Sequence, residues 1–237
     1  LMGYEGTCIF DNCENKGNIT TANSGGMCSV YAGKGGIVTF TNCSNTGIIS
    51  GEKAGGLCGQ GAFNIELSNC SNTGVITGKS AGGMCGENAQ NVIMEYCFNT
   101  GKLSGDFAGG LGGTAIGKSG AETLIMYCYN TGEVASSQGG GIIGSHAADN
   151  AGLVTIINCY NAGDISSPYA GGISGRYTGS LNGIVNIYNC YNLGDTNGYG
   201  AITGNGTHAT TTILNCYHVG ASTDKMADSG SISTDSG

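Results

Sequence analysis

The chain has 237 residues, of which 47 are Gly and one is Pro, and charged residues make up only 10%. Globular proteins usually carry about a quarter charged residues, so this surface must be built largely from Ser, Thr, Asn and Gly. The net charge of −8 argues against nucleic acid as a partner, because nucleic-acid binding needs clustered Lys and Arg. The sequence has no transmembrane stretch, which predicts that it does not insert into a membrane.

A short phrase, Asn-Cys-x-Asn-x-Gly, recurs along the whole chain from its first copy at residues 12–17. Successive cysteines of the phrase lie 26 to 31 residues apart. They are Cys13, Cys43, Cys70, Cys97, Cys128, Cys159, Cys190 and Cys216. A second phrase, Gly-Gly-Met/Leu-Cys, lies between the first copies and weakens further along the chain. Eight matches at near-constant spacing establish an internal repeat.

The spacing within each repeat is that of a strand. After each cysteine the recurrent residues fall two, four and six positions later, which is the period of a strand with one buried face. Each unit offers about three short strands, too few to bury a face unless the units stack. The sequence therefore predicts an all-β fold, a parallel β-helix or β-solenoid of about eight coils. An aliphatic residue or Phe lies three places before each cysteine, and this odd offset predicts a bend or bulge between them.

The repeat domain is expected to span residues 1–220. It starts within a repeat, because Leu1, Met2 and Gly3 read as the end of a Gly-Gly phrase. Residues 221–237 are rich in Ser, Asp and Gly and are predicted to form a terminal cap or a linker. Three longer repeats carry extra residues at 114–122, 145–152 and 176–183. We expect these insertions to project from one side of the rod, either as a binding side or as neutral loops.

The two phrases together resemble the GLUG-motif repeats of bacterial cell-surface proteins, a family that includes segments of secreted IgA-cleaving proteases and of adhesin-like proteins. The matching elements are Gly-Gly-Leu-Cys-Gly at 55–59 and Asn-Cys-Tyr-Asn-Ala-Gly at 158–163. The resemblance covers about residues 1–220. It implies an extracellular solenoid with a spacer, adhesive or scaffolding role and no catalytic residues. One departure is Cys at 28, 58 and 85, where the family usually has Val or another aliphatic residue.

Twelve cysteines raise the question of disulfides or metal sites. The sequence has no Cys-x-x-Cys pair, and His146, His208 and His218 are scattered. Cysteines stacked at the strand spacing hold their Cβ atoms further apart than a disulfide prefers. We therefore predict buried thiols that act as small hydrophobic side chains, with no metal and no cofactor. The Asn column two places after the cysteines is predicted to form a ladder of inward amides.

The column one place after each cysteine holds the candidate binding site. It begins with Glu14, Ser44 and Ser71 and then becomes aromatic. The aromatic members are Phe98, Tyr129, Tyr160, Tyr191 and Tyr217. By alternation they face outward, so five consecutive coils present an aromatic strip. Such a strip either stacks on sugar rings or docks another chain, or it simply stabilises the sheet through cross-strand pairs.

Two other columns are candidate sites. Glu133, Asp164 and Asp195 stack as carboxylates after Lys102, and we expect them to be solvated rather than bridged by a cation. An array of four threonines, Thr46, Thr73, Thr100 and Thr131, suggests ice binding. However, an ice-binding face needs two parallel rows, and the neighbouring row changes from Ser to Tyr.

Enzymes on β-helices usually gather carboxylates and basic residues in a groove, whereas the acidic residues here are spread along the chain and Arg176 is the only arginine. No nucleophile or phosphate-loop motif is evident, so the sequence predicts no enzyme. The leading hypothesis is that the chain is a structural or adhesive segment of an extracellular protein. Its expected partners are other copies of itself or the rest of a larger surface protein. End-to-end assembly into filaments is a variant of this hypothesis. The alternatives are a glycan-binding module that uses the aromatic strip and, third, an ice-binding solenoid.

Overall fold

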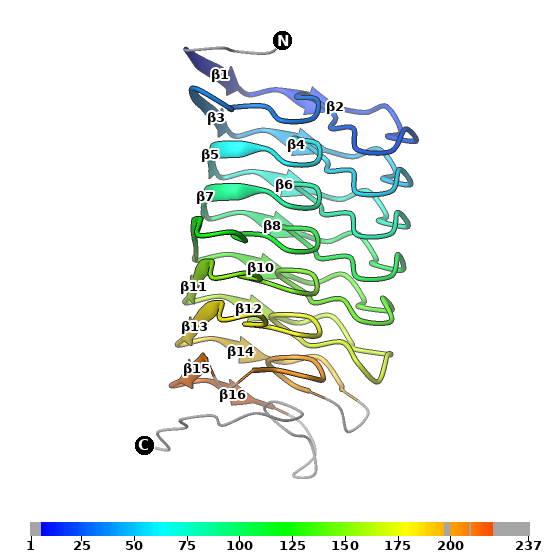
Figure 1. The fold of residues 1–237 in the computed structure, drawn as a ribbon. Helices are drawn as coiled ribbons and strands as arrows, with labels where there is room; N and C mark the ends of the chain where they lie inside the picture. The colour runs from blue at the N-terminus through cyan, green and yellow to red at the C-terminus, as the bar shows by residue number, and fades with distance from the viewer. Residues whose placement is uncertain (1–5, 197–199, 209, 220–237) are drawn as a thin grey trace.

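The computed structural model describes residues 6–196, 200–208 and 210–219. The expected start within a repeat at residues 1–3 and the expected cap or linker at 221–237 lie outside these ranges. Figure 1 shows the described chain as a stack of similar coils, with its first and last coils at opposite ends. Within the described ranges, no helix has the length and apolar character needed to cross a membrane.

Two parallel sheets of eight strands each run along the stack. The long strands of the first sheet are β1 (Thr7–Asp11), β3 (Ile37–Thr41), β5 (Phe63–Ser68), β7 (Gln90–Glu95), β9 (Glu122–Met126), β11 (Leu153–Ile157), β13 (Ile184–Tyr188) and β15 (Thr211–Leu214). The short strands of the second are β2 (Glu14–Asn15), β4 (Ser44–Asn45), β6 (Ser71–Asn72), β8 (Phe98–Asn99), β10 (Tyr129–Asn130), β12 (Tyr160–Asn161), β14 (Tyr191–Asn192) and β16 (Tyr217–His218). Each strand pairs with its equivalent one coil away, which confirms the predicted all-β parallel β-helix.

The third strand expected in each coil is reduced to single bridging residues. Parallel bridges link equivalent positions of successive coils, as between Ile49 and Ile76, Gly55 and Gly82, and Cys58 and Cys85. The Gly-Gly phrase explains the difference, because the chain turns sharply there and passes very close to the next coil. A Cβ added at Gly55 would collide with the backbone of Gly86 and Cys85. The phrase therefore selects glycine for close approach of two backbones.

The predicted bend before each cysteine is confirmed. The residue immediately preceding the cysteine has a left-handed backbone in every coil, with φ of 52° at Asn12 and 54° at Tyr127. One residue in this conformation redirects the chain, so that the residue three places before the cysteine and the cysteine itself both face inward. Asn tolerates this conformation better than other non-glycine residues, which explains why Asn holds the position in six of the eight coils.

The core lies between the two sheets and repeats from coil to coil. The column three places before the cysteines is at most 2% exposed from the second coil to the seventh. Its members there are Phe40, Leu67, Met94, Ile125, Ile156 and Ile187. Burying each such side chain contributes about 1.5–3 kcal/mol, so every added coil extends one continuous core.

The insertions at 114–122 and 145–152 do not project as free loops. Ile116, Ala147 and Ala148 within them are fully buried and belong to the main hydrophobic cluster. Their backbones also bond from coil to coil, as where the Ala148 amide donates to the Ile116 carbonyl oxygen at 3.0 Å. The expectation of projecting loops was wrong for these two insertions, because they carry apolar residues that are buried when they stack on one another. In the third insertion, at 176–183, Leu181 is 67% exposed.

Candidate functional site

The aromatic strip occupies the first residue of five successive short strands, β8, β10, β12, β14 and β16. Parallel pairing places Phe98 directly opposite Tyr129, Tyr129 opposite Tyr160, and so on to Tyr217. The strip residues are half-buried, except that Tyr217 is 53% exposed. The structure therefore brings together all five residues that the sequence singled out, in one row on the outer side of the second sheet.

The five rings form one continuous stack. Neighbouring ring centroids are 5.0 to 5.1 Å apart, and the interplanar angles are between 4° and 8°. This spacing matches the separation of parallel strands, about 4.8 Å, so the backbone itself sets the ring separation. The faces of Tyr129, Tyr160 and Tyr191 are each turned toward rings on both sides.

What the strip offers to a partner is therefore mainly ring edges and phenol hydroxyls. A sugar that stacks on an aromatic side chain needs an open ring face. Phe98 provides one, because its neighbour in the preceding coil is Ser71, which carries no ring. Burial, and then the phenols of Tyr129 and Tyr191, raise the pKa of Tyr160. The Tyr160 hydroxyl thus acts as a neutral donor and acceptor at physiological pH.

A second aromatic stack lies at the bend before the cysteines and was not singled out from the sequence. Tyr96 and Tyr127 stack with centroids 5.1 Å apart and an interplanar angle of 9°, and they are 53% and 46% exposed. The available signal was that these two coils carry Tyr where the others carry Asn. The two tyrosines widen the aromatic surface next to Phe98 and Tyr129, which lie two residues further along the chain.

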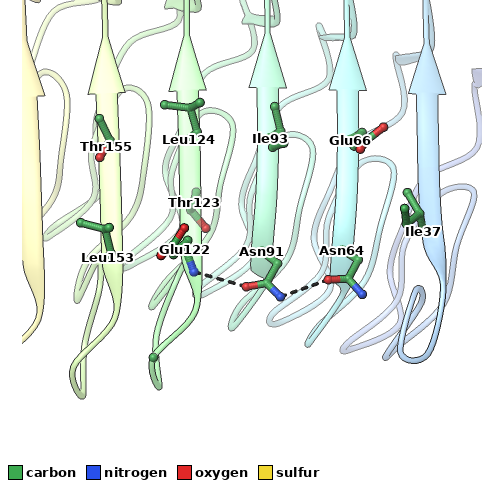
Figure 2. Close-up of a pocket in the computed structure, with 11 residues that line it drawn as sticks. Ile37, Asn64, Glu66, Asn91, Ile93, Glu122, Thr123, Leu124, Leu153 and Thr155 are labelled. Atoms are coloured by element: carbon green, nitrogen blue, oxygen red, sulfur yellow. Dashed lines mark hydrogen bonds between the residues drawn. The ribbon is translucent and has the colours of Figure 1, made fainter.

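The outer face of the first sheet carries an open groove of about 860 Å³. Its lining comes from the outward side chains of β3, β5, β7, β9 and β11, as Figure 2 shows. Glu66 and Ile93 also line a smaller adjoining hollow that includes Glu95. Repeat analysis alone did not identify this groove, because its residues belong to variable positions that differ from coil to coil.

The floor at one end of the groove is held by side-chain amides. Asn91 Nδ2 donates to Asn64 Oδ1 at 3.0 Å, and Asn64 Nδ2 donates to the Gly36 carbonyl oxygen at 3.1 Å. The Glu122 amide donates to Asn91 Oδ1 at 3.2 Å, so the chain of bonds continues onto β9 (Figure 2). Asn64 and Asn91 both have left-handed backbones, with φ of 52° and 50°. The hydrogen bonds of their side-chain amides take the place of backbone bonds between neighbouring strands, because Asn64 and Asn91 do not pair in the sheet.

Beneath the strip, the predicted Asn ladder is confirmed. Asn45 Nδ2 donates to Asn72 Oδ1 at 2.7 Å and to the Gly47 carbonyl oxygen at 2.8 Å. The same pair of bonds is made by Asn15, Asn45, Asn72, Asn99, Asn130 and Asn161. In the last described coil His218 takes the Asn position, with its Nδ1 atom 3.1 Å from Asn192 Nδ2. The ladder satisfies buried polar groups and fixes the residue that follows each strip member.

The cysteines are free thiols in the core, as predicted. Nine are buried, while Cys8, Cys13 and Cys216 are half-buried at the two ends of the described stack. The Sγ atoms of Cys58 and Cys85 in adjacent coils are 3.8 Å apart. Burial raises the pKa of Cys28 and of Cys43 to about 11, so the thiols at these positions stay protonated and unreactive near neutral pH.

The other candidate columns lie on the surface. Lys102 forms an ion pair with Glu133 at 2.7 Å, and the bond from Lys102 lowers the pKa of the Glu133 carboxyl. Asp164 Oδ1 accepts a bond from the Asp195 amide at 3.1 Å. The threonines of the proposed ice-binding array are all exposed. Within the described ranges, no group of three or more His, Cys, Asp or Glu side chains is arranged to hold a metal ion.

Arg176, the only arginine, is held by contacts within its own coil and with the preceding coil. Its guanidinium carbon lies 4.2 Å from the centroid of the Tyr177 ring and 4.9 Å from that of Tyr169, and Nη1 donates to Gln138 Oε1 at 3.1 Å. Stacking of this kind stabilises a partly desolvated guanidinium. These contacts assign Arg176 a structural role in joining two turns of adjacent coils.

The comparisons with known proteins leave the chain without an assigned family. No protein-family model matches it, and neither a curated protein nor a solved structure does.

Proposed function

We propose that this chain is a non-catalytic structural and adhesive segment of an extracellular surface protein. The observation that carries the proposal is the stacked aromatic strip, which lies on a core and an Asn ladder repeated from coil to coil. The rigid, repeated interior holds the strip in a fixed position, which lowers the entropy lost on docking. The likeness of its two phrases to GLUG-motif repeats supports the cell-surface location.

The partner we propose is another copy of the chain or a neighbouring part of the same surface protein. Ring edges and hydroxyls suit a protein surface, since aromatic side chains are enriched in interface cores and hot spots. Coils that stack in parallel also have open strand edges at their ends wherever no cap covers them, and open edges favour pairing with a further chain. End-to-end filaments are therefore the self-assembling form of this proposal.

Electron microscopy of the purified chain over a concentration series tests the proposal. We expect unbranched assemblies that become longer at higher concentration. Replacing two central strip residues, Tyr160→Ser with Tyr191→Ser, should reduce adhesion between neighbouring assemblies, whereas the surface changes Thr73→Ala with Thr100→Ala should not. Isolated single particles at every concentration, unaffected by either pair of changes, would contradict self-association.

Glycan binding is a second candidate, which the open face of Phe98 beside Ser71 favours. In this alternative, one sugar ring stacks at the start of the strip rather than along its whole length. Phe98→Ala should then abolish retention on a polysaccharide column, while Tyr160→Ala should reduce it only slightly. Equal retention of the parent and the Phe98→Ala variant would eliminate this alternative.

A further inference from the structure

The groove on the outer face of the first sheet is acidic. Glu66, Glu95 and Glu122 are on three successive strands, β5, β7 and β9, and their side chains line the groove or the adjoining hollow. None of the three forms an ion pair with any residue in the part of the chain that the structure describes. Lys118, in the loop before β9, likewise makes no ion pair with a described residue. The carboxylates are therefore available to a cation from outside.

An apolar centre lies among these carboxylates. Ile93 is 42% exposed, although it lies in the middle of strand β7. It pairs with Glu66 on one side and with Leu124 on the other, and Glu95 lies two residues further along the same face. The nearby Leu153 on β11 also lines the groove (Figure 2). A ligand that fits the groove must therefore combine apolar and positively charged groups.

The shape of the groove favours an extended chain over a compact small molecule. It crosses five adjacent strands, which at about 4.8 Å per strand corresponds to a length of about 19 Å. An extended polypeptide of about six residues spans that distance. Hydrogen bonds from the side-chain amides of Asn64 and Asn91 hold one end of the groove floor in place. The groove therefore loses little conformational entropy when a ligand binds.

We propose that this groove binds an extended polypeptide segment in which Lys or Arg side chains flank an apolar residue. The apolar residue packs on Ile93 and Leu124, and the cations pair with Glu66, Glu95 and Glu122. Charge complementarity selects this occupant over a second copy of the chain, which would bring another net charge of −8. The proposal does not depend on the aromatic strip, which lies on the other sheet.

The test uses a fluorescent synthetic peptide, Lys-Ser-Val-Ser-Lys, titrated with the full chain and followed by fluorescence anisotropy at low ionic strength. Side chains alternate along an extended peptide, so the two Lys and the Val of this probe share one face. We expect saturable binding that weakens as salt is added, and no binding of Glu-Ser-Val-Ser-Glu. Combining Glu66→Gln, Glu95→Gln and Glu122→Gln should weaken binding about tenfold, since each exposed ion pair contributes only modestly. Ile93→Ser alone should weaken it about fivefold through lost apolar contact.

The matched control removes the same charge elsewhere by combining Glu14→Gln, Glu52→Gln and Glu133→Gln, and it should leave binding within about twofold of the parent. Thermal unfolding of each variant checks that it is folded. If the triple variant is unfolded, the single change Glu66→Gln replaces it. Failure of the Lys-Ser-Val-Ser-Lys peptide to bind would overturn the proposal, as would equal weakening by the control. Concentration-dependent dimers that Ile93→Ser abolishes would also overturn it, in favour of a second copy as occupant.

Discussion

At the scale of single residues, the buried Asn column is the most constrained part of the chain. Each amide makes two bonds, one to a glycine carbonyl of its own coil and one to the next Asn, so both of its protons are used. Each Asn side chain also bonds to the Asn side chains of both neighbouring coils. A change at one position therefore leaves unpaired groups in three successive coils.

Asn99→Ala should lower the free energy of unfolding by about 3 kcal/mol. It leaves Asn72 Nδ2, Asn130 Oδ1 and the Gly101 carbonyl oxygen each short of one bond inside the core, and an unsatisfied buried group costs about 1–3 kcal/mol. Urea unfolding followed by circular dichroism measures the difference. The adjacent exposed change Thr100→Ala is the control, and an equal effect of the two substitutions would show that the ladder is not stabilising.

The raised pKa values of two buried thiols predict how the free energy of unfolding depends on pH. Burial raises the pKa of Cys28 and Cys43 to about 11, from a value of 9.0 in an unperturbed thiol. Above pH 9 the unfolded chain loses these protons while the folded chain retains them, so stability should fall as pH rises from about 9 to 11. Below pH 9 both states are protonated, and these two thiols should cause no change.

Urea unfolding at a series of pH values measures this decline. The variant Cys43→Ala should show a shallower decline, because it releases one proton fewer on unfolding. The difference in thiolate absorbance near 240 nm between the parent and Cys43→Ala reports the ionisation of Cys43 in the folded protein. If that difference instead appeared near pH 9, the Cys43 thiol would be accessible rather than buried.

At the scale of the elements, the short strands β8 to β16 owe part of their stability to the aromatic stack. A strand of two residues makes few backbone bonds, so its side chains must contribute. Aromatic pairs across neighbouring strands contribute about 0.5–1.5 kcal/mol beyond the area that they bury. The strip therefore has a structural role whether or not it binds a partner.

A double-mutant cycle isolates this contribution. Tyr160→Ala and Tyr191→Ala, made singly and together, should give a coupling energy of about 1 kcal/mol, because these rings stack directly at 5.1 Å. The same cycle between Tyr129 and Tyr191, which are two coils apart, should give a coupling close to zero. Equal coupling in both cycles would indicate a change of the whole sheet rather than a contact between rings.

Features that repeat in every coil could be predicted from the sequence, and those that vary between coils could not. The Asn ladder, the buried thiols and the bend before each cysteine follow from a period of two and from the odd offset to the residue three places earlier. The third strand was overestimated, because the Gly-Gly phrase gives the spacing of a strand without its continuous bonding. The groove around Ile93 was missed, because Glu66, Glu95 and Glu122 occupy different positions in their three repeats.

At the scale of the whole molecule, the outer surfaces change along the rod while the core does not. In the column of the strip, the first three coils carry Glu14, Ser44 and Ser71, and the next five carry rings. Because neighbouring coils contact only each other, a surface can vary along a solenoid without altering its interior. The chain thus combines one repeated scaffold with an acidic groove on one sheet and an aromatic strip on the other.

Both surfaces depend on one feature of the fold, the in-register stacking of equivalent residues at one strand spacing along the described chain. Double electron–electron resonance measures this stacking, with spin labels attached through a ketone-bearing amino acid so that the native thiols are not modified. Pairing position 16 with 131, 162 or 193, which lie four, five and six coils further on, should give distances near 19, 24 and 29 Å, an increment of about 4.8 Å per coil. Distances that do not increase evenly with the number of coils would contradict in-register stacking.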